Sequence, residues 1–245
     1  GGAPLNPDVG TFFASLGLTL LQGYGQTESA PVVSCNLPDK IKMATVGRPL
    51  PGVEVKIAED GEILVRGGLL MDGYWGNEES SAEALKDGWL HTGDIGVFDD
   101  DGFLMITDRK KDLIVNSGGD NIAPQRVEGI LNLEAEVGQA MVYGDKRPYL
   151  VALVVPDDNY LVEFAKRHNL SPRLAEVADE PALLTEIKAA VDRANQQLSA
   201  IEKVKRVMIA TEAFTVDNGQ MTPTMKVRRH MVKELYGEAL EGLYR

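Results

Sequence analysis

Residues 108–124 read DRKKDLIVNSGGDNIAP, and this stretch divides the chain into two parts of different character. Residues 1–108 carry 6 Lys and Arg against 17 Asp and Glu, whereas residues 109–245 carry 19 against 20. The net charge is therefore −11 before the stretch and −1 after it, −12 for the whole chain. Because residues 109–112 are polar and lack apolar anchors, we expect a hinge there. A segment of a large domain over residues 1–108 and a small domain over residues 113–245 would flank it.

Hydrophobic patterning also differs between the two parts. Alternating apolar runs and an Asp-Gly turn predict that residues 50–107 are largely β and barrel-like, after a first helix and a buried strand at residues 18–21. Residues 113–245 combine apolar β runs with helical periodicity, including a last helix at residues 225–236. The fold class that we expect is therefore α/β and α+β, with barrel-like strands first and a compact α+β domain last.

The composition excludes several classes of protein. With 44% hydrophobic and 25% charged residues, the chain has enough apolar material for a folded core. The net charge of −12 disfavours nucleic acid as a general partner, because surfaces that bind it are basic. The single cysteine, Cys35, excludes an internal disulfide framework and a cysteine-based zinc site, and it suits a reducing cytoplasm. No apolar run in the sequence has the length of a membrane span.

Two motifs in the first part are suited to a nucleotide. GYGQTES begins at Gly23 and contains Tyr24, whose ring offers a flat face to a base. It also supplies the Thr27 hydroxyl and the Glu28 carboxylate for phosphate and Mg²⁺ chemistry. WLHTGD ends in Asp94, whose carboxylate can accept both hydroxyls of a ribose. Taken alone, GYGQTES is as readily a glycine-bearing surface turn, and Asp94 is more commonly a turn residue or a helix N-cap.

The second part holds local clusters of bases that are suited to a phosphorylated small molecule. They lie at residues 109–111, 203–206 and 226–229. TPTMKVRR places Lys226 directly before Val227 and two arginines. Taken alone, this motif is more commonly the solvated basic start of a helix, and DRKKD is a charged linker.

Five segments occur in the order GYGQTE, GEILVRG with GYW, WLHTGD, DRKKDLIVNSGGDNIAP and TPTMKVRR, and together they span nearly the whole chain. In this order the chain resembles the adenylate-forming superfamily of acyl-CoA synthetases, adenylation domains of non-ribosomal peptide synthesis and beetle luciferases. It looks most like the long-chain fatty acid–CoA ligases. The resemblance implies the β-barrel-like tail of a large AMP-binding domain followed by a complete, mobile C-terminal domain.

The resemblance also implies roles for individual residues. Contacts with the nucleotide are implied for Gly2, Ala3, Pro4, Gly23, Tyr24, Gly25, Thr27, Asp94 and Arg109. The two glycine-containing segments would enclose the adenine, Thr27 would contact the α-phosphate, and Asp94 with Arg109 would hold the ribose. Glu28 resembles the Mg²⁺ ligand, and Lys226 resembles the catalytic lysine.

The implied substrates and cofactors are a fatty acid, ATP, Mg²⁺ and CoA. A fatty carboxylate must first attack ATP to give an acyl-adenylate and pyrophosphate, and a lysine between the two approaching anions gives the largest electrostatic gain. The small domain would then turn about Lys111, which occupies the hinge position. Gly118 and Gly119 look like the loop that lines the pantetheine tunnel when the CoA thiol attacks the adenylate.

The chain departs from the superfamily pattern in two places. A Ser/Thr/Gly-rich phosphate loop ending in lysine does not occur in it, so we expect a C-terminal fragment with little or no ligase activity alone. Met225 precedes Lys226 where many short-chain relatives have glycine, which puts a medium- or short-chain substrate in doubt.

Two further functions remain open. One is a fatty acyl-AMP ligase that loads the pantetheine arm of a carrier protein. The other is a non-catalytic module that binds a nucleotide or a partner. We expect a cytoplasmic location, and peripheral membrane contact is a minor hypothesis because long-chain fatty acids reside in bilayers.

Overall fold

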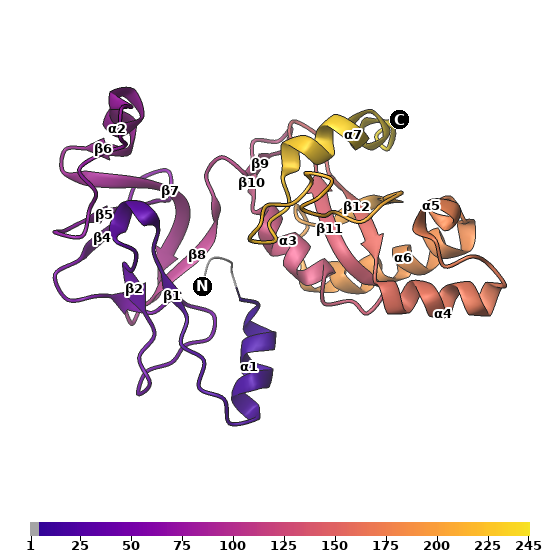
Figure 1. Ribbon diagram of the computed structural model, residues 1–245, viewed down its shortest axis with the longest axis horizontal. Coiled ribbons are helices and arrows are strands. Elements are labelled where there is room, and N and C mark those ends of the chain that lie inside the picture. Colours follow the sequence, from indigo (N-terminus) through magenta and orange to yellow (C-terminus); the bar gives the residue numbers. More distant parts are fainter. Residues whose placement is uncertain (1–4) are drawn as a thin grey trace. The chain divides into compact units, whose positions relative to one another are not determined.

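The computed structural model describes residues 5–245 (Figure 1). The chain forms two compact units, Gly1–Asp112 and Leu113–Arg245. Hydrophobic side chains gather in a separate core within each unit. Among residues 5–245, no helix has an apolar stretch of the length needed to cross a bilayer.

The first unit begins with helix α1 (Pro7–Ser15), as the sequence predicts. Asn6 caps this helix, because its side chain accepts a hydrogen bond from the Asp8 backbone N at 2.8 Å. A small antiparallel sheet follows in the order β1-β2-β3, with the 3₁₀ helix η1 between β1 and β2. These elements are β1 (Gly23–Tyr24), η1 (Thr27–Ser29), β2 (Ser34–Cys35) and β3 (Arg48–Pro49).

A larger antiparallel sheet forms the rest of the first unit. Its strands are β4 (Glu54–Ile57), β5 (Glu62–Arg66), β6 (Leu85–Lys86), β7 (Trp89–Phe98) and β8 (Leu104–Arg109). They are ordered β4-β5-β7-β6, and β8 also pairs with β7. Helix α2 (Glu78–Ala84) precedes β6 and is capped by Asn77. The elements of this sheet lie within residues 50–107, which the sequence predicts to be largely β, except that β8 continues to Arg109.

The barrel-like closure expected of this sheet is not confirmed. A barrel requires its last strand to pair with its first. Among residues 5–245, β4 pairs with β5 alone, while the short β6 and β8 share the other side of β7. The sheet is therefore open, and no pairing joins β8 to β4 in the described chain.

Strand β7 carries polar residues into the interior of the first unit. Side chains alternate along a strand, so Leu90, Thr92 and Asp94 share one face. All three are buried, and Leu90 packs in the core with Ile63 and Leu104. The fold thus brings a carboxylate into a buried position, where it needs polar partners.

The second unit is built on the three-stranded sheet β11-β12-β13. β11 and β12 are antiparallel, whereas β12 and β13 are parallel. Its elements in chain order are β9 (Ile114–Val115), β10 (Asn121–Ile122), α3 (Pro124–Leu131), β11 (Val137–Tyr143), β12 (Leu150–Pro156), α4 (Asp158–His168), α5 (Leu174–Val177), α6 (Pro181–Ala194), η2 (Asn195–Gln197), β13 (Val204–Ile209) and α7 (Arg229–Gly242).

Helices cover both faces of the central strand β12, so all of its residues are buried (Figure 1). One face packs in a core with α3, α4 and α6, through Leu150, Ala152 and Val154. The other face packs against α7, through Val151, Leu153 and Val155. This two-sided burial explains why the strand reads as a continuous apolar run rather than an alternating one.

Two expected elements are wrong. Residues 18–21 form no strand, because no neighbouring strand among residues 5–245 pairs with them; Leu18 and Leu21 are 53% and 42% exposed. The last helix begins at Arg229 and not at residue 225, because residues 221–227 fold back on themselves in a bridged loop.

Candidate functional site

Three residues that the sequence predicts to contact a nucleotide meet at a buried carboxylate. The Tyr24 hydroxyl donates to Asp94 Oδ2 at 2.6 Å, and Arg109 Nε donates to Oδ1 at 3.2 Å. Asp94 on β7 lies directly opposite Arg109 on β8. Burial raises the pKa of the Tyr24 hydroxyl, and the Asp94 charge raises it further, so this hydroxyl remains a donor. Side chains far apart in sequence therefore converge on Asp94.

The Asp94 carboxylate keeps capacity for a ligand. An ionised carboxylate offers about four lone-pair positions, and Tyr24 and Arg109 each use one. Each oxygen can therefore accept one more hydrogen bond, which is what a vicinal diol requires. Tyr24 itself is 8% exposed. The ring that we expected to offer a flat face to a base is thus almost wholly covered, and its hydroxyl is held by Asp94.

Thr27 and Glu28 lie on the short helix η1, which begins three residues after the end of β1. Glu28 Oε1 accepts a hydrogen bond from the Tyr74 hydroxyl at 2.8 Å. Partial burial raises the pKa of Tyr74, and the contact with Glu28 adds to this effect. Within residues 5–245, no group of three or more His, Cys, Asp or Glu side chains could hold a metal. A single carboxylate suits Mg²⁺, which keeps several waters and takes other ligands from substrate phosphates.

The glycine at position 25 has a structural reason. A Cβ atom built there would lie 1.6 Å from the Pro31 carbonyl oxygen. Any side chain at this position would therefore collide with backbone, whether or not a ligand is present. Gly23, on the neighbouring strand β1, is less restricted, with the Ser34 carbonyl oxygen 3.0 Å from such an atom. The roles of Gly23 and Gly25 towards adenine stay predictions.

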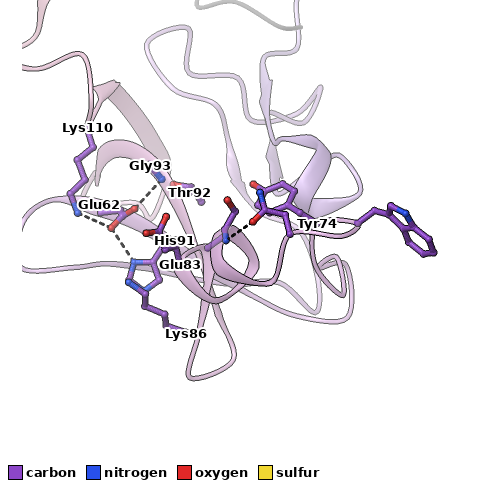
Figure 2. A pocket seen from close by; sticks show the side chains of 12 residues that line it. Glu62, Tyr74, Glu83, Lys86, His91, Thr92, Gly93 and Lys110 are labelled. Atoms are coloured by element: carbon purple, nitrogen blue, oxygen red, sulfur yellow. Dashed lines mark hydrogen bonds and ion pairs between the residues drawn. The ribbon is translucent and has the colours of Figure 1, made fainter.

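An open pocket in the first unit is lined in part by Thr92 and Gly93, the two residues before Asp94 (Figure 2). Asp94 itself is not among the residues that line this pocket. Glu62 is one of the residues that line this pocket, and 6% of its side chain is exposed. Figure 2 shows His91, Gly93 and Lys110 converging on this carboxylate. Burial raises the pKa of Glu62, but hydrogen bonds from His91 and Lys110 outweigh it, so the pKa lies below its ordinary value.

Sequence reasoning assigned no role to Glu62 or Tyr74, although both lie in quoted motifs. The available signal was an acid directly before the apolar run Ile63–Val65 in the strand Glu62–Arg66. An acid at the start of an apolar run is commonly a solvated strand end. The contact between Tyr74 and Glu28 joins residues 46 positions apart and has no local signal.

In the second unit, Lys226 lies in a tight loop and is exposed. The Thr222 backbone N donates to the Lys226 carbonyl oxygen at 2.8 Å, and the Met225 backbone N donates to the Thr222 carbonyl oxygen at 2.9 Å. Met225 has φ of 60°, in the left-handed region that favours glycine. The loop presents Lys226 free of helical constraint, and glycine would adopt the conformation of Met225 without strain.

The other predicted residues are placed as follows. Lys111 is exposed in a turn closed by a hydrogen bond of 2.9 Å from the Asp112 backbone N to the Arg109 carbonyl oxygen. Gly118 and Gly119 lie in the exposed turn between β9 and β10. The predicted segment Gly2, Ala3 and Pro4 lies outside the described residues. Lys226, Gly118 and Gly119 belong to the second unit, and the Asp94 cluster belongs to the first.

Comparison with known families accounts for most of the chain. Residues 1–75 match the AMP-binding enzyme family, and residues 111–245 match the AMP-binding enzyme C-terminal domain. The chain belongs to the AMP-binding enzyme family. Among curated relatives, the chain is 42% identical over 246 residues to the long-chain-fatty-acid–CoA ligase FadD15 of Mycobacterium bovis. That match covers 100% of this chain and 41% of the relative, so the chain spans about two fifths of its length.

Solved structures confirm the adenylation-domain fold of the chain. The A domain of carboxylic acid reductase from Segniliparus rugosus, in complex with AMP and a co-purified carboxylic acid, matches with a TM-score of 0.80 and 25% identity. That match covers 99% of this chain and 38% of the other. The A-PCP didomain of carboxylic acid reductase from the same organism, in complex with AMP, matches with a TM-score of 0.76 and 26% identity over 99% of this chain and 33% of the other. These findings confirm the resemblance to the adenylate-forming superfamily.

Proposed function

We propose that the chain is the C-terminal part of a long-chain fatty acid–CoA ligase. The cluster of Tyr24, Asp94 and Arg109 carries this proposal, because it presents a buried, oriented carboxylate with two free acceptor positions. Such a carboxylate suits the two hydroxyls of a ribose. The 42% identity to a long-chain-fatty-acid–CoA ligase supports the substrate class.

In the first half-reaction, an oxygen of the fatty carboxylate attacks the α-phosphate of ATP, and pyrophosphate leaves. Asp94 accepts hydrogen bonds from the ribose hydroxyls. Thr27, whose hydroxyl is expected to contact the α-phosphate, lies on η1, four residues after the start of β1. Lys226 donates to the oxygens on which negative charge gathers, since a compact ammonium on a flexible stem can reach between two anions. Glu28 would hold Mg²⁺, which would screen the charge of the phosphates.

In the second half-reaction, the CoA thiol attacks the acyl carbon of the mixed anhydride, and AMP leaves with the bonding electron pair. Lys226 is not required for this step, so its domain can turn away. The turn at Arg109–Asp112 is polar and closed by one backbone hydrogen bond, which suits it to absorb that movement. Gly118 and Gly119 would then line the path of the pantetheine arm.

A second acceptor is favoured by a specific observation. The A-PCP didomain of carboxylic acid reductase shares this fold, with a TM-score of 0.76. Transfer of the acyl group to the pantetheine arm of a carrier protein uses the same adenylate and the same attack by a thiol. A non-catalytic module that only binds a nucleotide would bind ATP without releasing pyrophosphate.

A chimera tests these alternatives. These 245 residues replace the matching region of the M. bovis ligase, and pyrophosphate release and acyl-CoA formation are measured with a long-chain fatty acid. We expect thioester formation that requires ATP and free CoA, and no turnover from the 245-residue chain alone. Transfer to a carrier protein in place of CoA would favour the second acceptor, and absence of pyrophosphate release would contradict the enzymatic function.

Two lysine variants of the chimera test the catalytic role. Lys226→Ala should lower adenylation by at least about a hundredfold, the usual cost of removing a donor from the transition state. Lys188→Ala is the matched control, because Lys188 is exposed on α6 in the same unit, and it should change the rate by less than about twofold. Unchanged adenylation in Lys226→Ala would contradict the role of that lysine.

A further inference from the structure

Glu62 is the most thoroughly buried acid beside the pocket, and it holds three donors. Its Oε1 accepts a hydrogen bond from the Gly93 backbone N at 2.9 Å. Its Oε2 lies 3.1 Å from His91 Nδ1 and 3.0 Å from Lys110 Nζ (Figure 2). The carboxylate therefore contacts both β7 and the residue that follows β8. These side-chain contacts are separate from the backbone hydrogen bonds that pair the strands of the sheet.

A bulge in the sheet makes the Gly93 N–H available to Glu62. Glu62 pairs with Ile95 and Leu64 pairs with His91, so three residues of β7 stand opposite one residue of β5. Gly93, in the middle of these three, has φ of 69° and turns its backbone out of the strand path. Bulges of this kind re-aim a neighbouring side chain, and the next residue along β7 is Asp94.

Lys110 closes the arrangement from the other side. Its backbone N donates to the Gly93 carbonyl oxygen at 2.8 Å, while its side chain reaches Glu62 and also Asp60 Oδ2 at 2.6 Å. Glu62 thus holds Gly93 and Lys110, the residues directly before Asp94 and directly after Arg109. The register of the sheet places Asp94 and Arg109 opposite each other.

We propose that Glu62 is a positioning residue for the nucleotide site, which sets the geometry of Asp94 and Arg109 by clamping Gly93 and Lys110. This rests on the proposed function. Glu62 does not touch the nucleotide, so its removal loosens the contact between Asp94 and the ribose without altering any reacting group. A residue that does not contact the ligand can still affect binding, because it fixes the orientation of the side chain that does.

The substitution Glu62→Gln tests the clamp because it preserves shape and removes charge. A glutamine has one oxygen and one NH₂ group, so at least one of the three donors then faces another donor. Glu54→Gln is the matched control. Glu54 pairs with Arg66 on the same sheet, and this pair is exposed, with 60% and 46% of the side chains accessible. Lys110→Met is a second variant, which keeps the apolar stem and removes the ammonium group.

The kinetic test uses the chimeric ligase. We expect Glu62→Gln to raise the KM for ATP at least about tenfold, with the KM for the fatty acid and for CoA changed by less than about twofold. Lys110→Met should raise the KM for ATP about threefold, and it decides the matter if Glu62→Gln does not fold. With 3′-deoxy-ATP, which lacks a ribose hydroxyl, the difference between Glu62→Gln and the parent should shrink to less than about twofold. An equal rise in all three KM values, or an undiminished penalty with 3′-deoxy-ATP, would overturn the proposal.

A structural measurement separates failure of the clamp from failure of the proposed function. Amide hydrogen exchange at Gly93 is measured by NMR in the 245-residue chain, which requires no activity. Glu62→Gln should speed this exchange at least about tenfold, and Glu54→Gln should leave it unchanged. If the parent chimera forms no thioester, the proposed function fails while the exchange still tests the clamp. Unchanged exchange at Gly93 in Glu62→Gln would overturn the clamp even in an active ligase.

Discussion

The substitution Tyr24→Phe removes one hydroxyl from the Asp94 cluster and leaves the aromatic ring in place. That hydroxyl donates to Asp94 Oδ2 at 2.6 Å, and 8% of the Asp94 side chain is exposed, so water cannot readily replace it. A hydrogen bond to a charged group contributes roughly 1.5–3 kcal/mol, and we take about 2 kcal/mol for this one. Unfolding entropy of about 2.1 cal/mol/K per residue, over a unit of this size, converts that loss to a fall in Tm of about 9 °C.

The assay follows the first unit selectively. The chain has two tryptophans, Trp75 and Trp89, and both lie in that unit. Tryptophan fluorescence during heating or urea titration of the 245-residue chain therefore reports on the unit that holds Tyr24. The control is Tyr74→Phe, which removes the hydroxyl that donates to Glu28 at 2.8 Å from a residue that is 39% exposed. We expect the control to cost less than about 0.5 kcal/mol, because water can replace that hydroxyl.

Either of two results would refute this reasoning. One is a loss below about 0.5 kcal/mol in Tyr24→Phe, which would mean that the buried carboxylate does not depend on the tyrosine. The other is an equal loss in Tyr24→Phe and Tyr74→Phe, which would mean that burial of Asp94 has no bearing on the strength of the contact.

Two further predictions concern the stability of each unit. Gly25→Ala should prevent the first unit from folding, because the added carbon would lie 1.6 Å from the Pro31 carbonyl oxygen. The control Gly68→Ala should fold normally, because the space around Gly68 is open. Tryptophan fluorescence and near-UV circular dichroism distinguish the two outcomes. In the second unit, burial, together with the carboxylate partners Glu241 and Glu186, raises the pKa of Tyr143 and of Tyr160 to about 12. Since the unfolded chain releases these protons near pH 10 and the folded chain keeps them, stability should fall as pH rises from about 10 to about 12. Urea midpoints measured at about pH 9 and about pH 11 check this, and a smaller fall is expected in the double variant Tyr143→Phe, Tyr160→Phe; an unchanged midpoint between the two pH values would contradict it.

Elements with a strong period were predictable from the sequence. The strand Trp89–Phe98 lies in the region that the alternating pattern predicts to be largely β, and the helix Pro124–Leu131 and the strand Val137–Tyr143 lie in the part predicted to be α+β. Residues 18–21 have an equally apolar pattern, but a strand needs a neighbour, and none among residues 5–245 pairs with them. The helix expected from residue 225 failed for a local reason, since Met225 adopts a left-handed conformation that a helix cannot continue.

The residues of the candidate site also fall into two groups, those identified from motifs and those found only in the structure. Tyr24, Asp94 and Arg109 were identified from motifs, and the structure brings the three together. Glu62 received no role, because its contacts with Gly93 and Lys110 depend on a bulge that shifts the register between two strands. A register is set by pairing across the sheet, and no local pattern of residues specifies it.

The sequence by itself determined the family, the types of residue available for chemistry, and most elements with a clear period. These properties depend on neighbours along the chain, where sterics and hydrophobic spacing act over a few residues. Only the tertiary structure decided that the sheet is open, that Tyr24 is buried with its hydroxyl on Asp94, and that Glu62 joins β7 to the end of β8. These features arise from contacts between residues tens of positions apart, and such contacts exist only when strand pairing has brought those residues together.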